Sequence, residues 1–388
     1  MEQPSGSHCA VEAPRFRLLV ILNRGAINGA VRQMTHWLPR LSRGRFEITV
    51  AFLRDSGPWG ARLLPADGAV WASMLRCRLD PVGAARLGLK ARSWRPDVVF
   101  SIDERNSMVL SRWVGLLTGA TVVTAIHSTP RVGRSPWWDR LTRGQVSRFL
   151  ALSPAHARHL ETAGVLTHRI IVVPNGVVDQ DPVERPRPPG HPVVCVFAGV
   201  LRGDKRVDVL LKAMALCAQH APLLRLHVAG DGPEAPRLRS TARALGIDAR
   251  VSWLGCVDDV NSVLREADIL VLPSDAGVET LSMAALEAMA VGLPVIATDV
   301  GSMEDAITPD VGILVKPGNP DSLANALMRL YEDGSLRAAL GRAAWRRQRR
   351  LFSSSSLCSR MEAVLTDAAR QRISSQVQPI ENPGRNVP

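Results

Sequence analysis

The sequence predicts an α/β protein with two doubly wound, Rossmann-like domains that face each other across a cleft. Short apolar runs rich in Val, Ile and Leu alternate with segments of helical periodicity, as expected for buried parallel strands and the helices that cover them. This alternation stops at a polar, proline-rich stretch and then starts again. Two such series joined by a linker predict two parallel sheets, with a ligand bound at the carboxyl ends of the strands.

The first series lies within residues 1–180 and predicts six strands. They are expected at residues 17–22, 47–52, 97–102, 121–126, 149–152 and 169–173. Helical periodicity is found over residues 30–41, 108–117 and 154–163. Ser153 followed by Pro154 is a typical helix start, because Ser caps the N-terminus and Pro suits the first turn. Residues 57–94 show no clear pattern.

Residues 179–192 read DQDPVERPRPPGHP and have no periodicity, so they predict an interdomain linker, placed at residues 181–192. The second series fills residues 193–350. Strands are expected at residues 193–198, 224–229, 250–254, 269–272, 294–298 and 312–315, and helices at 207–219, 236–245, 260–266, 282–290 and 321–331. Residues 351–371 are expected to form a helix that returns to the first domain. The tail, residues 372–388, has few large apolar residues and is expected to be disordered.

Composition limits the classes of protein. The chain has 388 residues, and 46% of them are hydrophobic, which excludes a wholly disordered or fibrous protein. Its formal net charge is +12, from 48 basic and 36 acidic side chains. This surplus is compatible with a phosphorylated ligand, an anionic membrane surface or nucleic acid as a partner.

Cysteines and apolar runs indicate the compartment. The six cysteines include no CxxC pair, so neither a disulfide framework nor a zinc site is expected, and a reducing cytoplasm fits better. The apolar run 18–22 is too short for a signal peptide. Residues 108–126 carry Arg112 and Gly119, which favours a helix followed by a strand over a membrane span. We therefore expect a cytoplasmic protein without a transmembrane helix.

The chain contains neither a G-x-G-x-x-G fingerprint nor a P-loop, which argues against an NAD-dependent dehydrogenase or a P-loop NTPase. Its most informative segment is residues 272–301, LPSDAGVETLSMAALEAMAVGLPVIATDVG, which predicts a strand, a loop and a helix. Glu279 lies in the loop, and Glu287 lies about two helical turns further on. Free N–H groups at the helix N-terminus would form an anion site for a diphosphate. These groups belong to Leu281, Ser282 and Met283. On spacing alone, an acid that complements the helix dipole plus an ordinary surface Glu is an equal alternative.

Several segments in fixed order resemble the family 4 glycosyltransferases of the GT-B class. They are residues 197–211 (FAGVLRGDKRVDVLL), 230–233 (GDGP), the Glu279/Glu287 pair, 172–177 (VVPNGV) and 310–341. The likeness covers most of residues 121–352. It implies a nucleotide-sugar donor bound mainly by the second domain and a glycan or lipid-linked acceptor bound mainly by the first. It also implies transfer with retention at the anomeric carbon, without an essential metal or a cofactor.

The resemblance also implies roles for single residues. Glu279 would hold hydroxyls of the donor sugar, Glu287 would hold the ribose, and Lys205 would meet the β-phosphate, where a fixed cation stabilises the leaving diphosphate. The family commonly has Gly-Arg-Leu before this Lys, whereas this chain has Gly199, Val200 and Leu201. Arg202 and Arg206 are the candidates to replace the missing guanidinium. The alternative is that Lys205 and Arg206 are solvated loop charges.

Two residues of the first domain are candidates by the same resemblance. Gly29 follows the first strand, where the family uses a glycine-rich loop that lets the backbone approach the donor phosphate and the acceptor. An ordinary tight turn is equally compatible with the sequence there. His127 ends the strand 121–126, where similar enzymes place a His against the donor sugar, although a lone His is more often structural. No side chain stands out as the catalytic base.

Residues 131–148 mix five Arg with Trp137 and Trp138. One interpretation is a patch that docks on an anionic membrane or receives a lipid-linked acceptor, which would place the protein at the inner face of the cytoplasmic membrane. The other is that the Trp side chains pack inside and the Arg side chains form a solvated face. Two further functions stay open: a nucleotide-sugar epimerase, and a non-catalytic basic protein that binds nucleic acid or membrane. The Glu279, Glu287 and Lys205 set favours the transferase, for which no nucleic-acid partner is expected.

Overall fold

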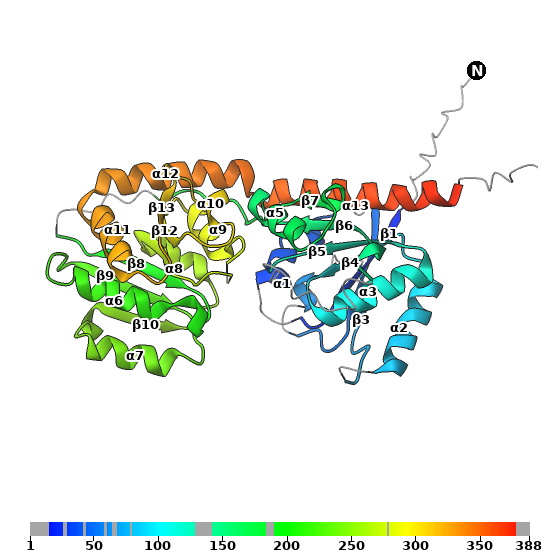
Figure 1. The fold of residues 1–388 in the computed structure, drawn as a ribbon, viewed down its shortest axis with the longest axis horizontal. Helices are drawn as coiled ribbons and strands as arrows, with labels where there is room; N and C mark the ends of the chain where they lie inside the picture. The colour runs from blue at the N-terminus through cyan, green and yellow to red at the C-terminus, as the bar shows by residue number, and fades with distance from the viewer. Residues whose placement is uncertain are drawn as a thin grey trace, which may run out of the picture.

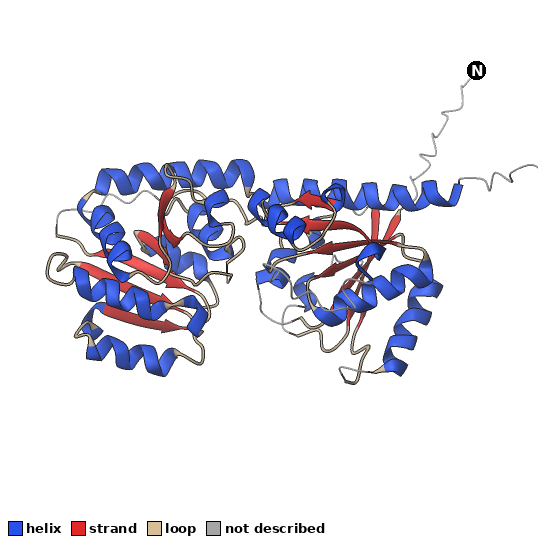
Figure 2. Ribbon diagram, in the orientation of Figure 1, coloured by secondary structure: helices blue, strands red, loops and turns tan. Residues whose placement is uncertain are grey.

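The computed structural model describes residues 15–25, 29–41, 44–57, 60–63, 68–77, 80–128, 142–183, 190–277 and 279–377. Two α/β lobes lie side by side, one formed by the first half of the chain and the other by the second (Figure 1). Each lobe contains one parallel sheet packed against helices (Figure 2). This arrangement confirms the expected fold of two doubly wound domains.

The N-terminal sheet has the strand order β3-β2-β1-β4-β5-β6-β7. Its strands are β1 (Phe16–Leu22), β2 (Phe46–Phe52), β3 (Ala69–Trp71), β4 (Val98–Ile102), β5 (Thr121–Ala125), β6 (Val146–Ala151) and β7 (Ile170–Val172). The helices around it are α1 (Gly29–Met34), α2 (Pro81–Trp94), α3 (Arg105–Thr118) and α5 (Pro154–Thr162). Strands β1 and β2 pair in parallel from Phe16 with Phe46 to Leu22 with Phe52.

The C-terminal sheet has the strand order β10-β9-β8-β11-β12-β13. Its strands are β8 (Val193–Ala198), β9 (Leu224–Ala229), β10 (Val251–Gly255), β11 (Ile269–Leu272), β12 (Val295–Thr298) and β13 (Gly312–Val315). The helices are α6 (Val207–Cys217), α7 (Ala235–Ala244), α8 (Val260–Glu266), α9 (Met283–Ala290), α10 (Met303–Ala306), α11 (Pro320–Glu332) and α12 (Gly334–Leu351).

Alternation along the strands explains why both faces of each sheet are covered. On β1, Leu18 and Val20 belong to the hydrophobic cluster that includes α1, whereas Leu19 and Ile21 belong to the cluster under α2 and α3. All four side chains are fully buried. Successive side chains of a strand point to opposite faces, so a continuous apolar run predicts a sheet with helices on both sides.

Most expected strands and helices are present, with ends shifted by a few residues. The continuous helix expected at residues 30–41 is wrong, because α1 stops at Met34 and a short 3-10 turn follows at Leu38–Arg40. Pro39 has no N–H for a continued α-helical ladder. Strand β3 and helix α2 lie in residues 57–94, where the sequence showed no clear pattern.

The last helix described is α13 (Ser354–Val377), which lies along the N-terminal lobe as the continuation of α12 (Figure 1). The expectation of disorder from residue 372 is wrong for residues 372–377, because the helix continues through them. Arg372 holds it there by donating to Asp97 Oδ1 at 2.5 Å and to the carbonyl of Pro96 at 2.5 Å. No local pattern reports these distant partners, and residues 378–388 lie outside the described part of the chain.

The chain crosses between the lobes twice, and the two crossings touch. Val177 forms a parallel bridge with Ser353, and the Gln180 carbonyl accepts the Trp345 indole N–H at 2.8 Å. Within the expected linker, the Val183 N–H bonds to the Val291 carbonyl at 3.1 Å. Residues 184–189 lie outside the described part. Among the helices described, none is long and apolar enough to cross a membrane.

Candidate active site

The candidate site lies where the carboxyl ends of β8, β11 and β12 meet the start of α9. Three loops gather there: residues 199–206 after β8, residues 273–282 after β11 with residue 278 left aside, and residues 299–302 after β12. Helix α1 of the N-terminal lobe faces this corner, since a Cβ added to Gly29 would stand 3.9 Å from Met283 Cγ. The residues singled out in both domains are therefore brought to one interdomain corner.

Lys205 and Glu279 form the centre of the corner. The Lys205 Nζ lies 2.5 Å from Glu279 Oε1, and their side chains are 19% and 9% exposed. The hydroxyl of Ser274 donates to the same oxygen at 2.9 Å. A carboxylate with two such donors is held in one orientation. Lys205 and Glu279 therefore act together, and a solvated loop charge does not describe Lys205.

Close backbone approach fixes the loop that carries Glu279. Gly301 has a φ of +62°, and a Cβ there would stand 1.8 Å from the Glu279 carbonyl oxygen. The Ser302 N–H donates to the Thr280 carbonyl at 3.1 Å. Only glycine combines this left-handed backbone with so little space. The packing of Gly301 thus determines where the Glu279 backbone sits.

The same loop is tied to the N-terminal lobe. Thr280 Oγ1 donates to the carbonyl of His127 at 2.9 Å, and Asn175 Nδ2 donates to the carbonyl of Leu281 at 2.9 Å. Thr280 and Asn175 are both buried. Buried hydrogen bonds across a junction favour one relative placement of the partners. The two lobes are therefore linked within this one corner.

Glu287 contacts the other lobe directly. Arg32 of α1 places its Nη2 2.8 Å from Glu287 Oε1, and the Glu287 side chain is 6% exposed. Burial raises the pKa of Glu287 to about 7, while Arg32 acts to lower it and Asp259 to raise it. The alternative of an ordinary surface Glu is excluded. The carboxylate expected to hold a ribose is occupied by a guanidinium here.

Arg202 and Arg206, the candidates to replace the guanidinium that is missing at Val200, both form ion pairs. Arg202 is exposed and makes a two-pronged contact with Asp204, at 3.1 and 2.8 Å. Arg206 lies 3.2 Å from Asp208 and 3.1 Å from Asp275. Its φ of +49° is a conformation that favours glycine. That backbone conformation explains why a glycine suits this position, and the two Asp partners compensate the Arg206 charge.

The glycines after β8 and β9 bring two loops together. A Cβ on Gly230 would stand 1.9 Å from the Gly199 carbonyl oxygen, and one on Gly232 would stand 2.5 Å from that of Leu201. The Leu201 N–H donates to the Asp231 carbonyl at 2.9 Å. Gly199 thus lies on the floor of the corner, where it lets the 230–232 loop support the turn that carries Lys205.

Helix α9 begins at Met283, and Ser282 is its N-cap residue without a side-chain capping bond. Leu281 lies one residue earlier, so of the three expected N–H donors only Met283 belongs to the helix itself. Within the described part of the chain, none of these three N–H groups has a protein acceptor. Unpartnered N–H groups at a helix start suit an anion.

His127 closes the corner on the N-terminal side. Its Nε2 is buried and has no hydrogen-bond partner among the residues that the structure describes. Burial lowers the pKa of His127, while Asp103 acts to raise it. Asp103 accepts the Ser128 backbone N–H at 2.8 Å. Ser128 in turn offers its carbonyl to His156 Nε2 at 3.2 Å. A neutral imidazole with one unused nitrogen can exchange a hydrogen bond with a ligand.

Sequence reasoning missed several residues of this corner. Arg32 and Thr280 gave no signal, because their partners Glu287 and His127 lie on the other lobe. Ser274 contacts Glu279 only five residues further on, but a single Ser at that spacing forms no motif. Of the basic and aromatic segment 131–148, residues 131–141, with Trp137 and Trp138, lie outside the described part of the chain. Arg143 and Arg148 are described, and both are engaged within the lobe, with the Ala163 carbonyl and with Asp367. Among the described residues, no group of His, Cys, Asp and Glu is arranged to hold a metal ion.

Two family models match adjacent parts of the chain. Residues 27–181 match the model described as glycosyltransferase family 4. Residues 180–347 match the model described as glycosyl transferases group 1. The two matches meet where the chain first crosses between the lobes.

Curated relatives resemble different shares of the chain. An exopolysaccharide phosphotransferase of Streptomyces coelicolor is 31% identical over 214 residues, which is 55% of this chain and 22% of that protein. A D-inositol 3-phosphate glycosyltransferase of Salinispora tropica is 36% identical over 173 residues, 42% of this chain and 36% of that protein. A phosphatidyl-myo-inositol mannosyltransferase of Mycobacterium leprae is 27% identical over 78% of this chain and 83% of its own length. The match thus spans about a fifth to a third of the first two relatives.

Solved structures share the fold over nearly the whole chain. Anabaena HepE in complex with UDP superposes with a TM-score of 0.77 at 19% identity, covering 91% of this chain and 100% of that one. The lipopolysaccharide outer core galactosyltransferase WaaB superposes with a TM-score of 0.70 at 22% identity, covering 93% and 100%. At these identities the likeness establishes the fold.

Proposed function

The chain belongs to the family 4 glycosyltransferases of the GT-B type, and we propose that it moves a sugar from a nucleotide-diphosphate sugar to a glycan or lipid-linked acceptor. We place this reaction in cell-envelope polysaccharide synthesis, on the cytoplasmic side of the membrane. The names of the relatives support it, since they include a mannosyltransferase and an inositol phosphate glycosyltransferase. HepE has also been solved with UDP-glucose.

The contact between Lys205 and Glu279 carries the proposal. It puts a cation and a carboxylate 2.5 Å apart beside the unpartnered N–H groups at the start of α9. A β-phosphate placed there meets the Lys205 ammonium, and sugar hydroxyls donate to Glu279. As the bond to the anomeric carbon breaks, negative charge grows on the leaving diphosphate. A fixed cation and helix N–H groups stabilise that charge without reorganising.

We assign Glu287 to the ribose of the donor. Arg32 holds this carboxylate at 2.8 Å, so a ribose must share the carboxylate with Arg32 or displace it. Arg32 belongs to the N-terminal lobe, so donor binding is coupled to the contact between lobes. We assign His127 to the donor sugar, because its buried Nε2 has no partner within the described part of the chain.

We propose retention at the anomeric carbon, with no essential metal and no cofactor. No side chain stands out in the sequence as a base for the proton of the acceptor hydroxyl. The departing phosphate can accept that proton if acceptor and leaving group lie on one face of the sugar, which is the geometry that retention requires. Arg202 and Arg206 add their positive charge to that of Lys205 only after their ion pairs with the neighbouring Asp side chains have broken.

The test is thermal stabilisation by a panel of nucleoside diphosphates. A ligand at about 100 times its Kd adds about 2.7 kcal/mol, which is readily seen as a rise in Tm. We expect one nucleotide to stabilise the wild type, with the effect reduced in Glu287→Gln and in Lys205→Ala. Glu332→Gln, an exposed change at the end of α11, is the matched control and should respond as the wild type does.

Activity is then measured as release of that nucleoside diphosphate from its sugar conjugates, with the anomeric configuration of the product read by NMR. If no nucleotide stabilises the wild type, the transferase proposal is overturned and the non-catalytic binding protein replaces it. An inverted product would overturn the retaining mechanism alone.

A further inference from the structure

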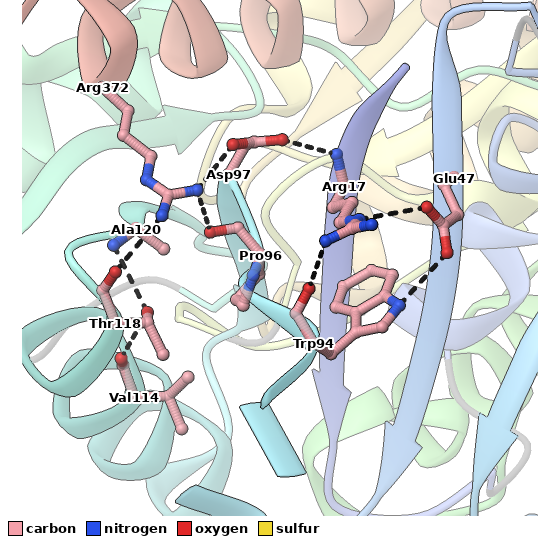
Figure 3. Close-up of polar contacts among 9 residues, drawn as sticks. All are labelled: Arg17, Glu47, Trp94, Pro96, Asp97, Val114, Thr118, Ala120 and Arg372. Atoms are coloured by element: carbon pink, nitrogen blue, oxygen red, sulfur yellow. Dashed lines mark hydrogen bonds and ion pairs between the residues drawn. The ribbon is translucent and has the colours of Figure 1, made fainter. Parts of the chain in front are cut away.

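A basic pocket lies at the edge of the N-terminal sheet where the strands begin. It is an open hollow of about 800 Å³ between the start of β1, the ends of α2 and α3, and helix α13 (Figure 3). Ligand sites commonly have volumes of ~300–1,000 Å³. The donor corner, which is the candidate active site described above, lies beyond the carboxyl ends of the strands. The length of the N-terminal sheet therefore separates it from the basic pocket.

Positive charge is in excess around this basic pocket. Its walls contain five guanidinium groups and two carboxylates. The guanidinium groups are those of Arg15, Arg17, Arg92, Arg95 and Arg372, and the carboxylates are those of Glu47 and Asp97. They come from separate segments that only the fold brings together.

Both carboxylates are already engaged. Glu47 accepts from Arg17 Nε at 3.2 Å and from the Trp94 indole at 3.2 Å. Asp97 accepts the Arg17 backbone N–H at 2.8 Å and Arg372 Nη1 at 2.5 Å. Figure 3 shows Arg17 between Glu47 and the Trp94 carbonyl, and Arg372 reaching down to Asp97. Arg17 and Arg372 are thus structural parts of the floor, and they use up the local negative charge.

Arg92 and Arg95 differ from that pair. Both are exposed, both line the pocket, and no carboxylate among the described residues pairs with either of them. At the C-terminal end of α2 their positive charge interacts favourably with the helix dipole, but one cation there would supply this small effect. Arg95 also has a φ of +54°, which favours glycine. Helix stability therefore does not explain why a second cation stands here on a strained backbone.

We propose that the basic pocket binds a phosphate-bearing polar group, distinct from the nucleotide of the donor corner. Guanidinium forks match phosphate oxygens in geometry and charge, and Arg92 and Arg95 supply two of them beside the fixed floor. Leu117 is the one apolar side chain in the wall, so the ligand is hydrophilic and of sugar-phosphate or headgroup size. The source is either a lipid headgroup or a soluble phosphate.

The test compares two charge-reversed variants of the full chain. One carries Arg92→Glu with Arg95→Glu. The other carries Arg243→Glu with Arg329→Glu, two exposed arginines of α7 and α11, and changes the net charge equally. Binding is measured to phosphatidylglycerol vesicles by co-sedimentation, and to inorganic pyrophosphate by calorimetry. The calorimetry is done in a Lys205→Ala background, which weakens the donor corner.

We expect the pocket variant to bind at least tenfold more weakly than the control variant to one of the two probes. Loss on vesicles alone identifies a lipid phosphate, and loss on pyrophosphate identifies a soluble one. Equal binding by the two variants to both probes overturns the proposal. Unchanged Tm shows that the variant folds, and Arg92→Gln with Arg95→Gln repeats the test if it does not. Nucleotide stabilisation should survive in the pocket variant, so this proposal and the donor proposal can fail separately.

Discussion

The ion pair between Arg32 and Glu287 makes a prediction that depends on pH. Two unit charges about 4 Å apart interact by ~4 kcal/mol near a protein surface. The Arg32 side chain is 31% exposed, so solvent screening reduces this, and we expect about half, ~2 kcal/mol. Arg32→Gln should remove that amount of stability, but only where Glu287 is ionised.

The direction of this pH dependence follows from the raised pKa of Glu287, which is about 7 in the folded protein and 4.5 for an ordinary Glu. The folded state holds this proton more tightly, so the Glu287 contribution to stability falls as the pH rises from 4.5 to 7 and then levels off. Without Arg32 the pKa rises further, so the fall continues above pH 7. Arg32→Gln should therefore have little effect on stability near pH 5.5 and a full effect near pH 9.

The assay is the Tm of four proteins at these two pH values: the wild type, Arg32→Gln, Glu287→Gln and the double variant. For domains of ~150–250 residues, 1 kcal/mol corresponds to ~2–4 °C, so we expect a drop of ~4–8 °C at pH 9. In the Glu287→Gln background the Arg32 change should cost the same at both pH values. A drop of equal size at pH 5.5 and pH 9 in the wild-type background would refute the reasoning.

Three further predictions rest on the described geometry. Gly301→Ala should lower Tm and abolish nucleotide stabilisation, since its Cβ meets a carbonyl at 1.8 Å; Gly246→Ala, with a φ of +68° and open space, should cost only the ~1 kcal/mol of the left-handed backbone and keep nucleotide binding. Asp80→Ala should lower the Tm, because the Asp80 side chain caps α2 by accepting the Gly83 N–H, whereas Asp80→Asn should change the Tm little. In native maleimide labelling, exposed Cys256 should react while Cys195 does not, because burial raises the pKa of the Cys195 thiol; rapid labelling of Cys195 would contradict its place in the core.

The strands could be predicted because their apolar runs are continuous and buried on both faces. Helix α2 could not, because small residues lie where large apolar ones would give a period. Gly88 is an example: a Cβ there would stand 2.2 Å from the Trp113 ring, so close packing replaces a leucine stripe. Periodicity detects large side chains, and a helix that packs through glycine escapes it.

The candidate active site was predictable to a similar extent. Glu279 and Glu287 stood out by their spacing and their resemblance to a family. Arg32 did not, because its partner lies 255 positions away on the other lobe, and no local pattern reports such a contact. The basic pocket was invisible for the same reason, since its arginines come from three separate segments of a chain that is rich in arginine throughout.

The second crossing of the chain has a consequence for the order of synthesis. Helix α13 completes the core of the N-terminal lobe, where Leu365 and Ala369 are fully buried with Leu18 and Val20 of the first strand. During synthesis, the C-terminal lobe emerges from the ribosome as one continuous stretch. The N-terminal lobe stays incomplete until helix α13 has emerged. The lobe that begins first is therefore the last to be completed, and a chain released before residue 354 would keep an open hydrophobic face along its first sheet.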